Sequence, residues 1–259
     1  MYTGIPTQRS CATTWLEATR QLLAGDAYNV ILDVTDPVNH SPSDHAVIKT
    51  VDDFLVQHKQ NPIATVANTI FPRAMYRQHG APALYDEYLR TFDALGSKGW
   101  GRYFERMVRS VDGKNGEAFR PLEKVTEKLR HCTGRGPAYK AVYEINIYDT
   151  AKDAGPFRGG QCLSYLSFKL HPSRGLLLTA VYRNHTYVTR CLGNLIGLGW
   201  LMEFVGREVG VEVGSLTVVS THAELDTGTW GKSGIEQLVE NAASAAAIVP
   251  ADVHETNSN

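Results

Sequence analysis

Three residues whose chemistry fits covalent catalysis follow one another along the chain: the thiol of Cys162, the guanidinium of Arg183 and the amide of Asn194. Cys162 comes directly after a glycine-rich turn at 155–160 and begins an alternating apolar run that predicts a strand. Free cysteines often serve as small buried apolar residues. A thiol becomes a nucleophile as the thiolate, and a nearby guanidinium or helix N-terminus lowers its pKa. Since a guanidinium and a predicted helix N-terminus both follow Cys162 closely in the sequence, we expect Cys162 to be a nucleophile whose pKa is lowered.

Two further elements position the other residues of this trio. A second apolar strand runs to Tyr182 and carries Arg183 at its end, and the helical spacing of 192–209 places Asn194 in the first turn of a helix. Arg183 could be an ordinary surface cation, but its place near the thiol favours a bidentate contact with a phosphate. Asn194 could cap the helix, or its amide could donate and accept side by side along the edge of a pyrimidine base.

A third candidate group is His222, Glu224 and Asp226, which alternate along a predicted strand and so share one face. One histidine and two carboxylates without a further ligand motif are weak evidence for a metal, and we predict none. A solvated strand face is the plain alternative. A carboxylate can accept from two adjacent hydroxyls, so this group would suit a ribose.

The order of these elements, from about Tyr143 to Asp226, resembles that of the thymidylate synthase and pyrimidine hydroxymethylase family. In that family a Pro-Cys strand carries the nucleophile, a Tyr-Gln-Arg-Ser strand end supplies a phosphate-binding arginine, and an asparagine at a helix start reads the base. The matching positions here are Cys162, Val181-Tyr182-Arg183-Asn184 and Asn194, with the same spacing from arginine to asparagine.

This sequence also departs from the family's pattern. Gly160-Gln161 replaces the proline before the nucleophile, and Asn184 replaces the serine after the phosphate arginine. Thr186 stands where the family has an aspartate that contacts folate, and Glu224 and Asp226 replace a sugar-binding histidine and tyrosine. Sugar recognition must therefore differ from that of the family.

The resemblance implies one-carbon transfer from 5,10-methylenetetrahydrofolate to carbon 5 of a pyrimidine nucleoside monophosphate. Cys162 would add to carbon 6 and make carbon 5 nucleophilic. Loss of the folate-contacting aspartate favours hydroxymethylation slightly over methylation. Two alternatives are a catalytically silent nucleotide-binding paralogue with a regulatory role, and a hydrolase built on Cys162 and His222, for which no oxyanion motif is present.

The same resemblance suggests further positions for the site. Asp53 matches a family glutamate that acts as a general acid or organises water, with Glu87 as its rival. The family is a homodimer whose sheets pack back to back, and each site borrows basic residues from the partner. Arg135 and Lys140 are the basic residues of this chain that could make that contribution. Residues 100–103 resemble a wall of the family's pocket.

Expected helices come early in the chain and expected strands later, which indicates an α+β fold with a mixed sheet and helices on one side. We expect one domain over residues 1–259, with a frayed polar tail from about 250 to 259. Residues 62–72 contain prolines and β-branched residues that predict extended structure. The expected helices are 13–23, 47–56, 83–95, 101–108, 121–129, 192–209 and 234–247, and the expected strands are 28–34, 139–148, 162–170, 176–188 and 215–225.

Composition limits the class of protein. A chain of 259 residues with 43% hydrophobic content can bury a full core, and a net charge of -1 gives no reason to expect binding to nucleic acid or membranes. The four cysteines lack CxxC spacing and predict reduced thiols in a cytoplasm. The first residues lack the features of a signal peptide, and glycines and Glu203 interrupt the apolar segment 192–209, which predicts a buried helix rather than a membrane span.

Overall fold

A seven-stranded mixed sheet organises the protein. The computed structural model describes residues 2–96, 102–114, 116–133, 139–155 and 159–248. Its strands follow the order β1-β2-β9-β7-β6-β5, and β8 lies beside β9. β1 with β2, and β7 and β8 with β9, are parallel pairs, while the other neighbours are antiparallel. The strands of the main sheet are β1 Thr3–Gly4, β2 Ala27–Val34, β5 Glu144–Asn146, β6 Leu163–His171, β7 Gly175–Tyr182, β8 His185–Thr186 and β9 Val213–Glu224.

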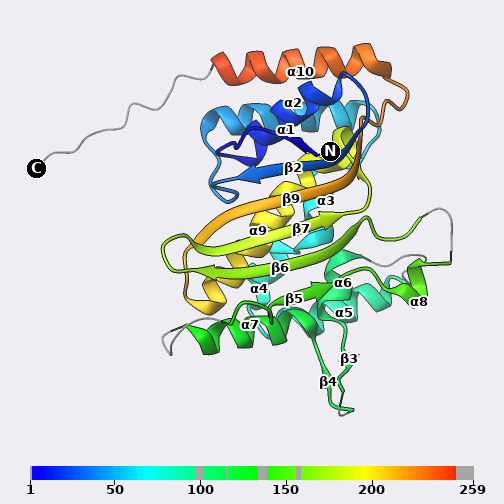
Figure 1. Ribbon diagram of the computed structural model, residues 1–259. Helices are drawn as coiled ribbons and strands as arrows, with labels where there is room; N and C mark the ends of the chain where they lie inside the picture. Colours follow the sequence, from blue (N-terminus) through cyan, green and yellow to red (C-terminus); the bar gives the residue numbers. More distant parts are fainter. Residues whose placement is uncertain (1, 97–101, 115, 134–138, 156–158, 249–259) are drawn as a thin grey trace, which may run out of the picture.

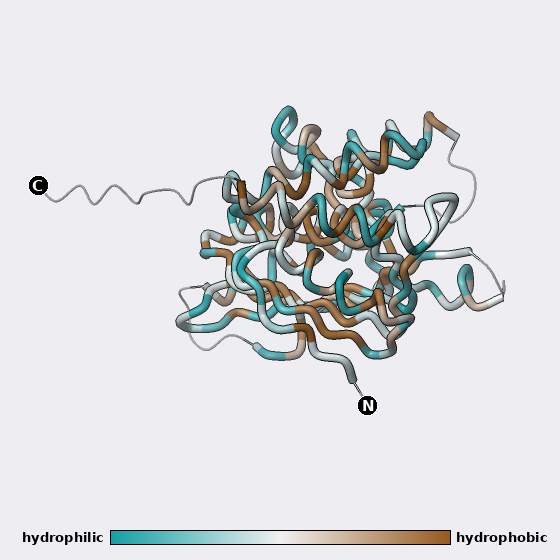
Figure 2. The backbone as a smooth tube through the Cα atoms, turned by 90° about the horizontal axis from the view of Figure 1, so that it is seen from above, coloured by the Kyte–Doolittle hydropathy of each residue, from teal (hydrophilic) through white to brown (hydrophobic). Residues whose placement is uncertain are grey.

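Helices cover one face of this sheet, as Figure 1 and the view from above in Figure 2 show. The expected α+β class with a mixed sheet is therefore confirmed. A separate hairpin, β3 Val111–Asp112 with β4 Ala118–Phe119, extends from the helical region. None of the helices within the described ranges is long and apolar enough to cross a membrane. The helices are α1 Cys11–Leu22, α2 Pro42–Gln57, α3 Ile63–Ile70, α4 Arg73–His79, α5 Ala83–Ala94, α6 Tyr103–Val108, α7 Pro121–Cys132, α8 Thr150–Asp153, α9 Leu192–Val209 and α10 Gly231–Ile248.

Helix α9 forms the centre of the core, because almost every one of its side chains is buried. Helix α3 approaches it closely where α9 has glycines. A Cβ at Gly193 would lie 2.6 Å from Cβ of Val66, and one at Gly197 would lie 2.7 Å from the carbonyl oxygen of Ala67. Small residues at these two positions thus bring α3 over the start of α9, where the candidate site lies.

Residues 62–72 are mostly helical, so the prediction of extended structure there is wrong. Ile63, Val66, Ala67 and Ile70 recur at helical spacing and are buried on one face of α3. The carboxylate of Asp52 accepts a hydrogen bond of 2.7 Å from the first backbone N–H of the helix. The prolines stand just outside its two ends, where they do not interrupt the helix.

Two expected strands are shorter than predicted. The segment predicted at 139–148 pairs only over Glu144–Asn146. The segment 176–188 divides into β7 and β8, and it then enters a π-helical turn, η1, at Tyr187–Cys191 that leads directly into α9. The expected polar tail at 250–259 lies outside the described residues.

Candidate active site

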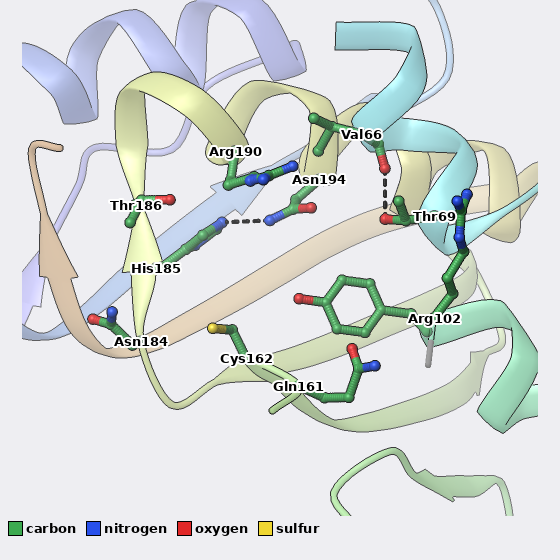
Figure 3. Close-up of a pocket in the computed structure, with 11 residues that line it drawn as sticks. Val66, Thr69, Arg102, Gln161, Cys162, Asn184, His185, Thr186, Arg190 and Asn194 are labelled. Atoms are coloured by element: carbon green, nitrogen blue, oxygen red, sulfur yellow. Dashed lines mark hydrogen bonds between the residues drawn. The ribbon is translucent and has the colours of Figure 1, made fainter. Parts of the chain in front are cut away.

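Cys162 lines a pocket of about 370 Å³ between the sheet and the helices. Its walls come from α3, the start of α6, the turn before β6, strand β8 and the beginning of α9. Asn184 and Asn194 line the same pocket, and Figure 3 shows the sulfur of Cys162 directed into the space that the Asn194 amide also faces. The fold therefore brings two of the candidate residues together with the thiol.

Arg183 supports the loop that carries Cys162. Its Nε donates to the carbonyl oxygen of Gln161 at 3.0 Å, and its Nη2 donates to that of Gly159 at 2.6 Å. The backbone N–H of Arg183 also donates to the Cys162 carbonyl at 2.9 Å. Arg183 is not among the residues that line the pocket. Its guanidinium thus serves the backbone of the turn, whereas the sequence predicted a phosphate contact.

The electrostatic environment of Cys162 differs from the expectation. Burial raises the pKa of its thiol, while the charges of Arg183 and Arg190 lower the pKa and that of Glu224 raises it. Burial is the largest of these effects, so the net direction is upward. The net shift of the Cys162 pKa is therefore opposite to the predicted lowering.

The start of α9 also differs from the expectation. Because η1 precedes α9, the residues before Asn194 are already helical, and the side chain of Cys191 at the start of α9 makes no capping hydrogen bond. The free N–H groups are at the start of η1, where Asp226 accepts from Val188 at 2.8 Å and from Thr189 at 3.1 Å. Asn194 is therefore not a helix cap, and Asp226 occupies that role for η1.

Asn194 contacts a buried histidine. Its Nδ2 lies 3.0 Å from Nε2 of His185, and Nδ1 of His185 lies 3.0 Å from Oγ of Ser220. The ring of His185 stacks on that of Tyr182 with centroids 4.1 Å apart and planes 3° from parallel. Burial lowers the pKa of His185 to about 3, so its ring is neutral.

Asn184 joins two residues of the predicted sugar-binding strand. Its Nδ2 donates to Glu224 at 2.8 Å, and Nδ1 of His222 donates to its Oδ1 at 2.6 Å. Nε2 of His222 also lies 3.5 Å from Oδ2 of Asp26. Neither His222 nor Glu224 lines the pocket, so Asn184 stands between them and any ligand. Asp226 follows the end of β9 and does not join this group. With His222 outside the pocket, the hydrolase alternative loses its base.

Asp53, Glu87 and Lys140 do not line the pocket. Asp53 is exposed on α2 and pairs with Lys49 at 2.6 Å, and Glu87 on α5 pairs with Arg90. Neither carboxylate lies where it could act as the general acid, which corrects that part of the sequence interpretation. Lys140 is exposed on the segment before β5, and Arg135 lies outside the described residues.

Two further arginines line the pocket: Arg102, within the segment 100–103 that in sequence resembles a wall of the family's pocket, and Arg190, which the sequence interpretation did not select. Both are exposed, and within the described part of the chain neither has a hydrogen-bond or ion-pair partner. Arg190 precedes Asn194 by one helical turn, so helical periodicity extended backwards from Asn194 would have found it. The predicted strand through residue 188 obscured this signal. No group of three or more metal-ligating side chains is placed to hold a metal ion in the ranges that the structure covers.

The fold and the site together define an α+β protein with a cysteine, a buried amide and cationic side chains in one pocket. No family model matches the chain. It is 33% identical over 104 residues to a protein of Methanothermobacter thermautotrophicus named "Putative thymidylate synthase". The aligned segment covers 40% of this chain and 44% of that protein. A protein of the same name from Methanosarcina mazei is 34% identical over 49% of this chain and 52% of its own length. Another from Methanococcoides burtonii is 29% identical over 53% of this chain and 57% of its own length.

The chain thus spans about half the length of the curated relatives it matches. These similarities support a distant relationship to a thymidylate synthase-like family, and they suggest an enzyme of one-carbon transfer at that level.

Proposed function

We propose that this protein transfers a one-carbon unit to carbon 5 of a pyrimidine nucleoside monophosphate through a covalent intermediate on Cys162. One observation supports the proposal: a thiol, a buried amide and two cationic side chains that have no partner among the described residues line a single pocket. The names of the relatives point in the same direction.

The residues of the chain would act in a defined order. The thiol of Cys162 loses its proton to solvent and its Sγ adds to carbon 6 of the ring, and the electrons of the 5,6 double bond move toward carbon 5 and oxygen 4. An N–H of Asn194 stabilises the charge that develops at that oxygen. Carbon 5 would then bond to the one-carbon unit and lose its proton to solvent. The amine of the donor would leave, and water would add to the resulting exocyclic methylene group to give the hydroxymethyl product. Departure of Sγ restores the double bond and the free cysteine. Hydroxymethylation is slightly favoured over methylation, since Thr186 replaces the family's folate-contacting aspartate.

The phosphate would bind to Arg190 and Arg102, which are available at the pocket wall, while Arg183 holds the turn. A guanidinium offers several N–H donors to phosphate oxygens, and no competing carboxylate pairs with these two side chains in the described ranges. Asn184, held from behind by Glu224 and His222, would contact the sugar. We propose a ribose at least as readily as a deoxyribose.

The proposed donor, 5,10-methylenetetrahydrofolate, rests on the resemblance and on the names of the relatives. The described pocket lining contains no carboxylate that could accept from the amino group of a pterin. At the corresponding position, Thr186 lies 3.4 Å from the hydroxyl of Thr189. The described residues therefore suit the nucleotide and do not suit the pterin.

A second copy of the chain is the proposed partner, packed against the open face of the sheet. On β7, buried residues alternate with half-buried ones such as Thr179 and Val181, which lie on the opposite face of the strand. Thr217 and Val219 continue this small, largely uncharged surface on β9. Such a surface suits a sheet of the same shape better than it suits a charged partner.

Trapping of the covalent intermediate tests this function. A fluorine at carbon 5 cannot leave as a cation, so a 5-fluoropyrimidine nucleotide should remain attached to Cys162 when the donor is present. Intact-mass analysis should then show an added nucleotide that disappears in Cys162→Ser and persists in the matched control Cys132→Ser. Tight binding of nucleotides without any adduct would instead favour the silent paralogue.

A further inference from the structure

We propose that His185 and Ser220 determine the base preference of the pocket by fixing the orientation of the Asn194 amide. The inference rests on the proposed function and deepens it. His185 would be a positioning residue, since it acts through Asn194.

The three side chains form a buried hydrogen-bonded line that leads from the sheet to the pocket. Ser220 Oγ, the two ring nitrogens of His185 and Asn194 Nδ2 are joined by two contacts of 3.0 Å. The relative exposures are 0% for Ser220, 1% for His185 and 3% for Asn194. Figure 3 shows the contact between His185 and Asn194 at the pocket wall. Water cannot easily replace a partner that is buried to this extent.

The donor and acceptor roles of Ser220, His185 and Asn194 follow from the chemistry of their side chains. A neutral imidazole carries one N–H and has one accepting nitrogen. The Nδ2 of an amide only donates, so Nε2 of His185 accepts from Asn194, and Nδ1–H donates to Oγ of Ser220. The parallel stacking on Tyr182 keeps the ring in the plane that both contacts require. The second Nδ2 hydrogen and Oδ1 of Asn194 then remain available to the pocket.

The orientation of an amide decides which base it matches. Uracil presents an accepting oxygen at position 4 beside a donating N3–H, whereas cytosine presents a donating amino group beside an accepting N3. An amide that can turn over by 180° satisfies either base. An amide whose nitrogen is held by His185 presents one order of donor and acceptor, and one of the two bases then leaves polar groups unmatched.

Base selectivity in three variants tests the proposal. His185→Phe keeps an aromatic ring on Tyr182 and removes both nitrogens, and Ser220→Ala removes the acceptor of Nδ1–H. Tyr182→Phe is the matched control, since the Tyr182 hydroxyl is buried and has no hydrogen-bond partner among the described residues. Calorimetric titration would give the affinities for uridylate and cytidylate, and thermal unfolding would verify that each variant is folded.

We expect the parent and Tyr182→Phe to prefer one base by roughly tenfold or more, as a mismatched buried hydrogen bond implies. In His185→Phe and Ser220→Ala the ratio should fall toward one. A ratio that is unchanged in both variants, or equal losses for both nucleotides, would overturn the proposal. If the parent binds neither nucleotide, the proposed function itself is wrong.

Nitrogen-15 NMR of the labelled parent tests the line without any substitution. The proton of His185 should reside on Nδ1, and Asn194→Ala should shift the Nε2 resonance. A proton on Nε2 would contradict the proposed orientation even if the variants fail to fold.

Discussion

A Cβ atom at Gly160 would lie 2.7 Å from Nη2 of Arg183. Gly160 also has a φ of +82°, a conformation that strains residues with a side chain. A Cβ at this position would therefore force the Arg183 side chain to move away from the carbonyl groups that it holds on either side of Gly160. This contact fixes the turn from which Cys162 enters the pocket.

Gly160→Ala should displace Arg183 and loosen the turn. The left-handed backbone alone should reduce the free energy of unfolding by roughly 1 to 2 kcal/mol. Chemical denaturation measures this loss, and alkylation kinetics should show an altered reactivity of Cys162. The control is Gly155→Ala, because its new Cβ would meet no heavy atom of the described residues within 4 Å. Equal effects of the two substitutions would contradict the role given to Arg183.

The reactivity of Cys162 should increase with pH beyond the range of an ordinary cysteine, because burial raises the pKa of its thiol. Arg190 lowers that pKa, so Arg190→Met should raise it further and slow alkylation by iodoacetamide at a fixed mildly alkaline pH, by roughly twofold to tenfold. Peptide mass spectrometry can follow Cys162 with Cys132 as the internal reference. Faster alkylation of Cys162 in Arg190→Met would contradict this electrostatic account.

The buried ion pair between Arg106 and Asp153 should stabilise the same region. Their side chains are 8% and 0% exposed, and Arg106 also donates to the carbonyl oxygen of Ile147 at 2.8 Å. Arg106→Met would leave Asp153 as a buried charge without this partner and should cost about 3 to 5 kcal/mol in the free energy of unfolding. Lys49→Met, at the exposed pair with Asp53, should cost less than about 1 kcal/mol. Urea unfolding at neutral pH compares the two.

The same pair predicts how stability depends on pH. The hydrogen bond from Arg106 lowers the pKa of Asp153 in the folded state. The resulting stabilisation is complete above the pKa of an unfolded aspartate, about 3.9, and is lost as the pH falls through the lower folded pKa. Arg106→Met should therefore reduce the loss of stability on acidification. An identical pH dependence in the parent and the variant would contradict this assignment.

Arg102→Gln and Arg190→Gln should weaken binding of a nucleoside monophosphate and leave binding of the matching nucleoside nearly unchanged. Each charge-assisted hydrogen bond that is lost should cost roughly 1.5 to 3 kcal/mol. Competition titrations with both ligands separate the phosphate from the rest of the nucleotide. Equal losses of affinity for the nucleotide and the nucleoside would show that these arginines do not contact the phosphate.

The sequence predicted the elements around the site better than the direction of its side chains. Apolar spacing located α9 and the main strands, and the order of Cys162 and Asn194 along them predicted that both would lie at one site. The orientation of Arg183 could not be predicted, since it depends on carbonyl groups in the turn at 159–161. A local pattern does not specify which way an arginine at a strand end will point.

Other differences have equally physical causes. In the prediction for residues 62–72, the prolines were given more weight than the helical repeat of the apolar residues in α3, and that repeat proved decisive. Asp53 matched a family position in sequence, yet α2 presents it to solvent beside Lys49. His185 had no recognisable signal, because a lone histidine after a strand acquires its role only through contacts with Ser220 and Asn194 that folding brings about.

Release of tritium from carbon 5 of labelled pyrimidine nucleotides tests the central claim most directly. Uridine and cytidine monophosphates, with ribose and with deoxyribose, should be incubated with the protein and methylenetetrahydrofolate. We predict release from one of them by the parent and by Cys132→Ser, and a decrease by orders of magnitude in Cys162→Ser with its fold intact. Equal release by Cys162→Ser and the parent would contradict the covalent role of Cys162 on which the proposed function depends.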